Sequence, residues 1–176
     1  IYSNIVIESN TNAIITVNEN LIVKTYNKAA EKIFGYKKNE MVCQNSLDKI
    51  IPKENLCAHN SGILEYFKKG LFKHSGESLE LLAMGKNKIQ FPIRISFGKN
   101  ISPHTKENIV IANIQDISSE KEKEALLIKN EKIYKDLFEL SKSVILLINP
   151  STGDIVNINN SALDFYGYTK EKFLTL

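Results

Sequence analysis

The chain contains one segment twice, and this repeat constrains its fold more than any other feature. Asn27–Glu40 returns as Asn159–Lys172, with an asparagine, an alanine and a Gly-Tyr pair in equivalent places 132 residues apart. The similarity continues upstream, where Ala13–Asn18 matches Val144–Asn149 at an offset of 131 residues. Because such self-similarity marks a chain built from related units, we expect one complete domain followed by the first part of a second.

Each copy has the pattern of a β-hairpin followed by a short capped helix. In the first copy, residues 13–17 and 21–26 are typical of strands, with a polar turn between them. Asn27 is a good N-cap residue, and Gly35 can adopt the left-handed conformation that ends a helix. The helix of the second copy is expected to carry an apolar stripe, namely Ala162, Phe165 and Tyr166.

The rest of the first copy predicts more short helices and then a meander of strands. Helical segments are expected at 38–42, at 46–51 and around Ile63–Phe67, the last ending at Gly70. Strands are expected near 79–84, 91–97 and 109–115, with turns at 86–88 and 98–108. This order predicts an α+β fold, an antiparallel five-stranded sheet with short helices on one face.

Residues 120–140 predict a long connecting helix after the sheet. Ser119 and Glu122 have the spacing of a capping box at its start. Apolar residues form a narrow seam at heptad-like intervals, interrupted by Asn130. We expect a homodimer that pairs through this seam, and packing of the helix on its own domain is the alternative. The seam residues are Leu126, Ile133, Leu137 and Leu140.

The composition is that of an ordinary globular protein, with 43% hydrophobic and 24% charged residues. The net charge of +3 is small and the basic residues are mixed with acidic ones, so we expect no nucleic-acid partner. No apolar run approaches the ~20 residues of a membrane span, so no membrane contact is expected within this chain. Cys43 and Cys57 lack metal-binding spacing and favour a reducing compartment. We therefore expect the chain to be cytoplasmic, and it could be the soluble part of a membrane-anchored protein.

No motif for catalysis or metal binding stands out. The chain has no phosphate-binding glycine loop and no His-Glu-x-x-His pattern. None of His59, His74 and His104 lies in a segment like the phosphoacceptor helix of a sensor kinase. We therefore expect no catalytic residues, no metal site and no enzyme within this chain.

Taken together, these segments resemble the PAS sensory-domain family. The resemblance is carried by the hairpin, by N-K-A-A-E-K-I-F-G-Y-K-K-N-E at 27–40, by L-E-L-L-A at 79–83, by F-P-I-R-I-S at 91–96 and by D-I-S at 116–118. The family often has glycine where Cys43 and Lys88 stand here. The resemblance divides the chain into a lead-in at 1–12, a PAS-like domain at 13–119, a signalling helix at 120–140 and the first part of a second PAS-like domain at 141–176.

The resemblance implies a sensory or relay module of a larger bacterial-type signalling protein, such as a sensor kinase or a cyclic-dinucleotide enzyme. A small apolar ligand would lie in a pocket between the helices and the sheet, and ordinary core packing is the alternative for the same residues. The expected lining is Phe34, Leu47, Ile50, Leu64, Phe67, Leu79, Leu81, Ile93, Ile95 and Ile114. The expected relay residues are Asp116, Ser118, Leu126, Ile133, Leu137 and Leu140.

For two cofactors that PAS relatives bind, flavin and haem, individual residues of this chain indicate whether binding is expected. Ser46 stands where flavin-binding photosensors carry a reactive cysteine, and serine cannot supply the thiolate, so flavin-adduct chemistry is disfavoured. The family's flavin-contacting amide positions are apolar here as well: Ala83, Ile93 and Ile114. His59 stands where haem-binding relatives place the iron ligand, although Leu79 replaces their arginine. A haem sensor is therefore the second hypothesis, and a ligand-free dimerisation module is the third.

Overall fold

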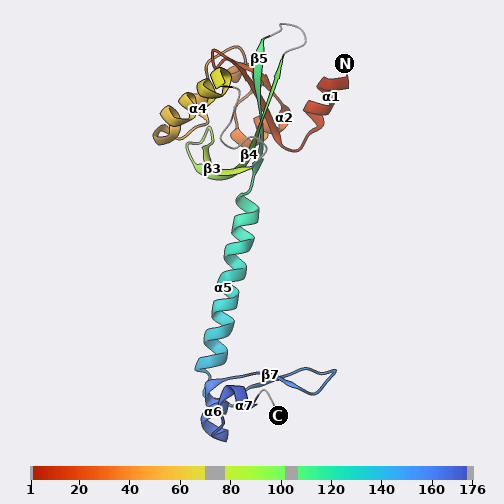
Figure 1. The fold of residues 1–176 in the computed structure, drawn as a ribbon, viewed down its shortest axis with the longest axis vertical. Helices are drawn as coiled ribbons and strands as arrows, with labels where there is room; N and C mark the ends of the chain where they lie inside the picture. The colour runs from red at the N-terminus through yellow and green to blue at the C-terminus, as the bar shows by residue number, and fades with distance from the viewer. Residues whose placement is uncertain (1, 70–77, 102–106, 174–176) are drawn as a thin grey trace. The chain divides into compact units, whose positions relative to one another are not determined.

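The computed structural model of the protein describes residues 2–69, 78–101 and 107–173 (Figure 1). They form two compact units, Ile1–Ser119 and Glu120–Leu176, each described here by itself. The lead-in of the first unit is a helix, α1 (Tyr2–Ser9). No helix within the described ranges is long and apolar enough to cross a membrane.

The first unit is built on a five-stranded sheet whose strand order is β2-β1-β5-β4-β3. All neighbouring strands pair antiparallel. The two strands of the hairpin thus lie beside the meander of the last three, which confirms the predicted α+β fold. The strands are β1 (Ala13–Asn18), β2 (Val23–Tyr26), β3 (Leu79–Met84), β4 (Gln90–Ile101) and β5 (Asn108–Asp116).

Two strand boundaries differ from the prediction. β2 begins at Val23 because Leu21 has a left-handed φ of 59°, which breaks the extended backbone. β4 continues to Ile101, so the prediction of a turn at 98–108 is wrong over 98–101. The residues Gly98–Asn100 favour turns, but Asn100 pairs with Ile109 of β5 and the backbone ladder overrides their propensity.

The helices of the first unit follow the predicted order. They are α2 (Lys28–Phe34), α3 (Lys38–Met41), the 3₁₀ turns η1 (Leu47–Lys49) and η2 (Lys53–Asn55), and α4 (Leu56–Lys69). As predicted, Asn27 caps α2 and Gly35 ends it with φ of 79°. The predicted stop of α4 at Gly70 lies outside the described residues.

The core of the first unit fills the space between these helices and one face of the sheet. Phe34 of α2 is 1% exposed, and its ring lies 5.9 Å from that of Phe91 on β4. Fully burying one such side chain stabilises the fold by about 1.5–3 kcal/mol. Other buried members are Ile15, Val17, Tyr26, Met41, Leu47, Ile50, Ile63, Ile93, Ile95, Val110 and Ile114.

Cys43 and Lys88, the two residues that replace the family's glycines, both adopt left-handed backbone conformations. Their φ angles are 63° and 64°. A side chain in this region costs conformational energy that glycine would not. Both turns are therefore formed here by residues other than glycine.

The helix α5 (Ser118–Leu140) begins one residue before the predicted capping box. The Asp116 carboxylate accepts hydrogen bonds from the Ser118 N–H at 2.9 Å and from its hydroxyl at 2.6 Å. This earlier acceptor starts the helix, so the predicted capping role of Ser119 is wrong: Ser119 lies inside the helix. The seam residues are exposed, from 46% for Ile133 to 79% for Leu140.

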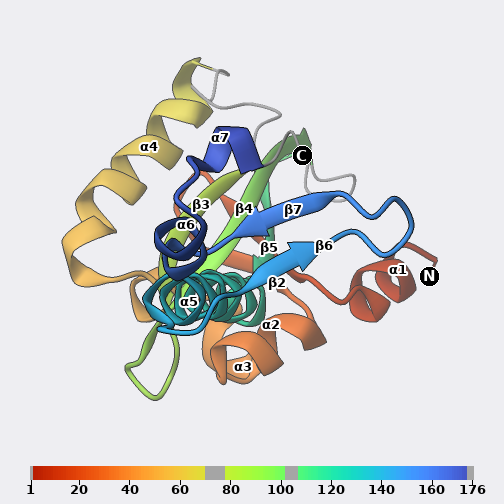
Figure 2. The same cartoon turned by 90° about the horizontal axis from the view of Figure 1, so that it is seen from below.

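The second unit repeats the beginning of the first. Its elements after α5 are β6 (Leu146–Ile148), β7 (Ile155–Ile158), α6 (Asn160–Tyr166) and α7 (Lys170–Phe173). Figure 2 shows β6 and β7 side by side, and they pair antiparallel. Asn159 caps α6 and Gly167 ends it with φ of 73°, the same cap geometry as that of Asn27 and Gly35 on α2.

The predicted apolar stripe of the second unit is buried only in part. Ala162 is fully buried, but Phe165 and Tyr166 are 73% and 47% exposed. Tyr166 occupies the position of Phe34, which is covered by Phe91 of the meander. Within residues 142–173 the only sheet is the pair β6-β7, so no such strand covers Tyr166.

Candidate ligand pocket

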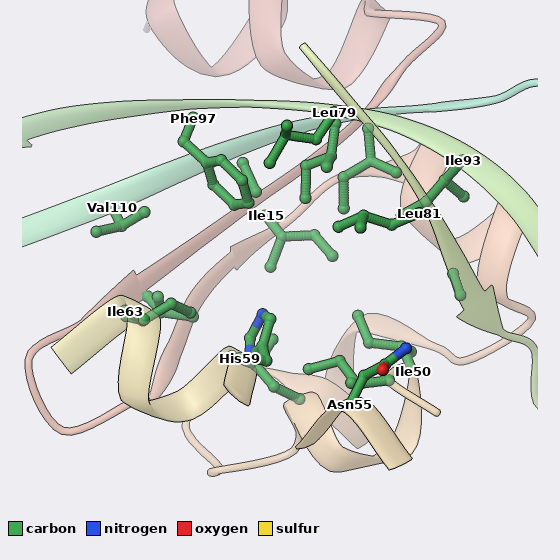
Figure 3. Close-up of a pocket in the computed structure, with 18 of the residues that line it drawn as sticks. Ile15, Ile50, Asn55, His59, Ile63, Leu79, Leu81, Ile93, Phe97 and Val110 are labelled. Carbon is green, nitrogen blue, oxygen red and sulfur yellow. The ribbon is translucent and has the colours of Figure 1, made fainter. Parts of the chain in front are cut away.

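A cavity of about 320 Å³ lies in the first unit between α4 and the inner face of the sheet (Figure 3). Ile63 and His59 approach it from α4, and Ile15, Phe97 and Val110 face it from the strands. The volume falls at the lower end of the range for pockets that bury small molecules. The cavity is therefore large enough for a ligand and not only a packing defect.

Eight of the ten predicted lining residues do line this cavity: Phe34, Leu47, Ile50, Leu79, Leu81, Ile93, Ile95 and Ile114. Leu64 and Phe67 do not, which corrects the prediction for α4. Leu64 is 40% exposed, and Phe67 packs against the core instead. The α4 face on the cavity is formed by Ala58, His59, Gly62 and Ile63, because one residue along a helix turns a side chain by about 100°.

Several lining residues were absent from the prediction. Ile15 and Val17 of β1, and Val110 and Ala112 of β5, alternate with outward residues and could have been found from that period of two. Leu82 lines the cavity although its neighbour Leu81 does too. No periodic signal identifies such a pair. The remaining lining residues are Ile51, Asn55, Ala58, Gly62, Ile63, Ala83 and Phe97, together with His59.

His59 is the most distinctive polar group of the cavity wall. Figure 3 shows its ring rising from α4 toward Ile15 on the sheet. Loss of water around the ring lowers the pKa of His59, and a contact with Asn60 partly offsets this. The imidazole is therefore neutral at pH 7. Asn55, also polar, lies at the cavity edge near Ile50.

The cavity wall is otherwise apolar. Among the described residues that line it, no side chain is charged. The described part of the chain also holds no group of three or more potential metal ligands. His74 and His104 lie outside the described residues. The arrangement can therefore bind an apolar molecule and direct one imidazole toward it.

The position of the photosensors' reactive cysteine is occupied by a structural serine. Ser46 is 1% exposed, and its hydroxyl donates a hydrogen bond to the Met41 carbonyl at 2.8 Å. It is not among the residues that line the cavity. Ala83, Ile93 and Ile114 do line it, and they present no amide to a flavin.

Strand β5 connects the cavity to α5. Val110, Ala112 and Ile114 line the cavity, and the strand ends at Asp116. Asp116 then holds Ser118, the first residue of α5. The predicted relay residues Asp116 and Ser118 thus form the junction, while the four seam residues lie exposed along the helix. These are Leu126, Ile133, Leu137 and Leu140.

Comparison with known proteins agrees with this architecture. The family model for the PAS domain matches residues 11–119 and again 142–176. Oxygen sensor protein DosP of Escherichia coli (strain K12) is 28% identical over 162 residues, which are 92% of this chain and 19% of that protein. The chain thus spans about a fifth of the length of this relative.

Solved structures show the same fold. The crystal structure of the PAS domain of a Colwellia psychrerythraea protein has a TM-score of 0.55 at 13% identity, over 67% of this chain and 96% of that one. The PAS domain of a two-component sensor histidine kinase has a TM-score of 0.52 at 11% identity, over 65% and 93%. Because the family model covers the complete sheet unit and matches again at the repeat, the chain belongs to the PAS-domain family.

Proposed function

We propose that this chain is a sensory and relay module of a larger cytoplasmic signalling protein, and that it is not itself an enzyme. The first unit binds a small ligand in its apolar cavity and passes the change to α5. The similarity to a protein named an oxygen sensor and to a domain of a sensor histidine kinase supports a sensory role, and we propose that the effector, such as a kinase or a cyclic-dinucleotide enzyme, lies outside this chain. Free, exposed Cys43 and Cys57 support a reducing compartment.

The observation that carries the proposal is the continuity of β5. Ile114 lines the cavity, and Ser118, four residues later, begins α5. A ligand that packs against Ile114 changes the position of the strand end, and hence the Asp116–Ser118 contact. A ligand shifts such an equilibrium only by binding one arrangement better than the other, so the proposal requires a second arrangement of this junction.

The relay also needs a recipient, and we propose a second copy of the chain. Along α5 the seam side chains Leu126 and Leu137 are 57% and 69% exposed. Leu127 and Ile128 are each 60% exposed, so the apolar surface is wider than the heptad seam. Pairing two such helices removes this surface from water. With Asn130 on the seam and about three turns of contact, the dimer would be weak and able to change.

A cavity-filling variant tests the coupling without knowledge of the ligand. Ala112→Phe places a ring inside the cavity from β5, and we expect altered hydrogen exchange of the amides at 118–140. Asn113→Phe is the matched control, because Asn113 is the next residue and is exposed rather than part of the cavity wall. A cooperatively folded Ala112→Phe protein with unchanged exchange in α5 would contradict the relay.

A haem sensor is the second candidate, on the single observation that the His59 imidazole lines the cavity. A neutral imidazole is a competent iron ligand, and DosP is named an oxygen sensor. The propionates of haem have no basic partner among the described lining residues, where Leu79 replaces the relatives' arginine. The described residues thus fit the iron and not the propionates. A visible absorption spectrum of the purified protein, compared with that of His59→Ala, tests this candidate.

A further inference from the structure

We infer that the cavity selects an uncharged, chain-like apolar ligand with one hydrogen-bond-donating end, such as a medium-chain alcohol, and that His59 receives this donor. The inference rests on the proposed ligand-binding role of the first unit and specifies the chemical class of the ligand. It follows from three properties of the cavity: its size, the direction of its polar group and the absence of charge on its described wall.

The size and shape of the wall favour an extended apolar chain. The cavity of about 320 Å³ lies at the lower end of the range for small-molecule pockets, so it suits a small ligand of about ten non-hydrogen atoms. Aliphatic side chains surround it on the sheet side, including Ile15, Leu79 and Ile93 (Figure 3). Such a wall offers dispersion contacts and no partner for a ligand with several polar groups.

The polar end is defined by how His59 is held. The Nδ1 atom of His59 lies 3.3 Å from the Asn60 Oδ1 atom. With the Asn60 amide oxygen as the acceptor of this contact, the proton of the neutral imidazole is on Nδ1, and we adopt this tautomer for the inference. Nε2 is then the acceptor of a neutral ring that Figure 3 shows rising from α4 toward Ile15. A ligand that satisfies Nε2 must bring an O–H or N–H donor.

The same geometry disfavours charged ligands. A carboxylate is only an acceptor, so it opposes the Nε2 lone pair instead of satisfying it. The described wall offers neither Lys nor Arg to pair a carboxylate, and neither Asp nor Glu to pair an ammonium. Burying an unpaired charge costs far more than burying a hydroxyl that is bonded. The cavity therefore discriminates an alcohol from the fatty acid or amine of the same length.

The experiment compares four compounds of nearly equal size on the 176-residue chain, at about pH 8, above the usual histidine pKa. They are octan-1-ol, its isomer heptyl methyl ether, octanoate and octylamine. Calorimetric titration and the ligand-induced rise in melting temperature report binding to the folded state. We expect octan-1-ol to bind about tenfold tighter than the ether, which lacks a donor. Octanoate and octylamine should bind more weakly still.

Two variants of His59 link the preference to the imidazole. His59→Leu should make octan-1-ol and heptyl methyl ether bind equally. His59→Gln keeps a hydrogen-bonding side chain and should retain part of the preference, so it serves if the leucine variant folds poorly. Ser61→Ala, at an exposed position of the same helix that does not line the cavity, should leave the preference unchanged.

The outcomes separate this inference from the proposed function. Octanoate binding as tightly as octan-1-ol, or a donor preference that survives in His59→Leu, would overturn the inference and leave the cavity as a ligand site. No binding by any of the four compounds would remove the cavity as a site for small apolar ligands. In that case both the inference and the ligand-sensing part of the proposed function fail.

Discussion

Asn27 and Asn159 occupy the same place in the two units and make the same hydrogen bonds there. The Oδ1 atom of Asn27 accepts from the N–H groups of Ile14 at 2.9 Å and Ala30 at 3.0 Å. The Oδ1 atom of Asn159 accepts from the two equivalent N–H groups, both at 3.0 Å. Both asparagines are fully buried. Asn27 thus joins β1 to the helix that it caps, and Asn159 joins α6 to the residue directly before β6.

The amide nitrogen of each asparagine donates to a carbonyl that lies in, or directly after, the preceding helix. The Nδ2 atom of Asn27 donates to the Ile7 carbonyl in α1 at 2.9 Å. That of Asn159 donates at 3.4 Å to the carbonyl of Ser141, the residue directly after α5. The second bond of each amide is equivalent in the two units: Asn27 donates to the Asn12 carbonyl at 3.0 Å and Asn159 to the Ser143 carbonyl at 2.9 Å.

Replacing Asn27 should be costly. Asn27→Ala removes the cap of α2 and leaves buried backbone groups without partners, so we expect a loss of about 3 kcal/mol in the free energy of unfolding. Asn27→Asp keeps the acceptor and loses the donor, so it should cost less. Urea denaturation measures both. Asn39→Ala, at an exposed site, is the control, and equal effects at residues 27 and 39 would contradict this role.

Replacing Lys88, a turn residue with left-handed backbone conformation, by glycine should stabilise the fold. Lys88 has φ of 64°, where a side chain is strained, so Lys88→Gly should raise the free energy of unfolding by about 0.5 kcal/mol. Lys37, with φ of −78°, is the control. Lys37→Gly should lower stability instead, since glycine adds only freedom to the unfolded chain there. Thermal melting in which both variants moved in the same direction would argue against strain at Lys88.

Substitutions at two adjacent residues of β4 should differ strongly in their effect on stability, because their side chains lie on opposite faces of the sheet. Ile93 is 5% exposed and lines the cavity, so Ile93→Asp buries an unpaired carboxylate and should cost about 4 kcal/mol. Arg94 pairs with Glu80 at 2.9 Å near the surface, and Arg94→Ala should cost about 1 kcal/mol or less. Chemical denaturation distinguishes the two. Similar losses of stability in the two variants would mean that the assignment of Ile93 to the inner face of β4 and Arg94 to the outer face is wrong.

Acid should weaken the first unit through His59. Its pKa is lowered in the folded state by desolvation, so below pH ~6.5 the unfolded chain binds more protons than the folded one. Stability contributed by the neutral ring is complete above that pH and falls as the pH drops through the lowered pKa. His59→Gln should flatten this part of the stability-against-pH curve. A wild-type curve that is level there, or a variant with the same slope, would exclude His59 as the cause.

The exposed seam of α5 gives a test of the proposed dimer. Ile133 is 46% exposed, and Ile133→Asp should shift the dimer–monomer midpoint to at least tenfold higher protein concentration, because it places a charge in the apolar contact. Lys132→Asp changes an adjacent position off the seam and should shift the midpoint little. Light scattering over a dilution series measures both. A monomer at every concentration would contradict pairing through α5.

Features of the fold and of the cavity that depend only on residues close together in the sequence could be predicted, and features that depend on distant residues could not. The caps of α2 and α6 are local: an asparagine and a glycine eight positions apart, with an apolar stripe between them, predict such a helix, as Asn27 and Gly35 do. The alternation of Ile93 and Ile95 is also local. The cavity positions Leu82 and Asn55 depend on how an edge strand and a 3₁₀ turn meet, which no period in the sequence records.

Features decided by the tertiary structure were predicted less well. The extension of β4 beyond Gly98 depends on the length of its partner β5. The start of α5 depends on the side chain that accepts a hydrogen bond from the first turn. This side chain is Asp116, which accepts from Ser118, and not the expected pair of Ser119 and Glu122. Leu64 was misplaced because two faces of α4 are both apolar, and only the packing of Ile63 distinguishes them.

The donor bonds of Asn27 and Asn159 also bear on how such a chain could have grown. Each asparagine bonds a carbonyl in, or directly after, the helix that precedes it, and β5 continues along the chain into α5. The segment that leaves the first unit is the same segment that leads into the second. A gene could therefore duplicate or lose one whole period of 132 residues and keep the same connection between units. Recombination that separated Ile7 from Asn27, or Ser141 from Asn159, would instead remove one acceptor of a buried amide and so lower the stability of that unit.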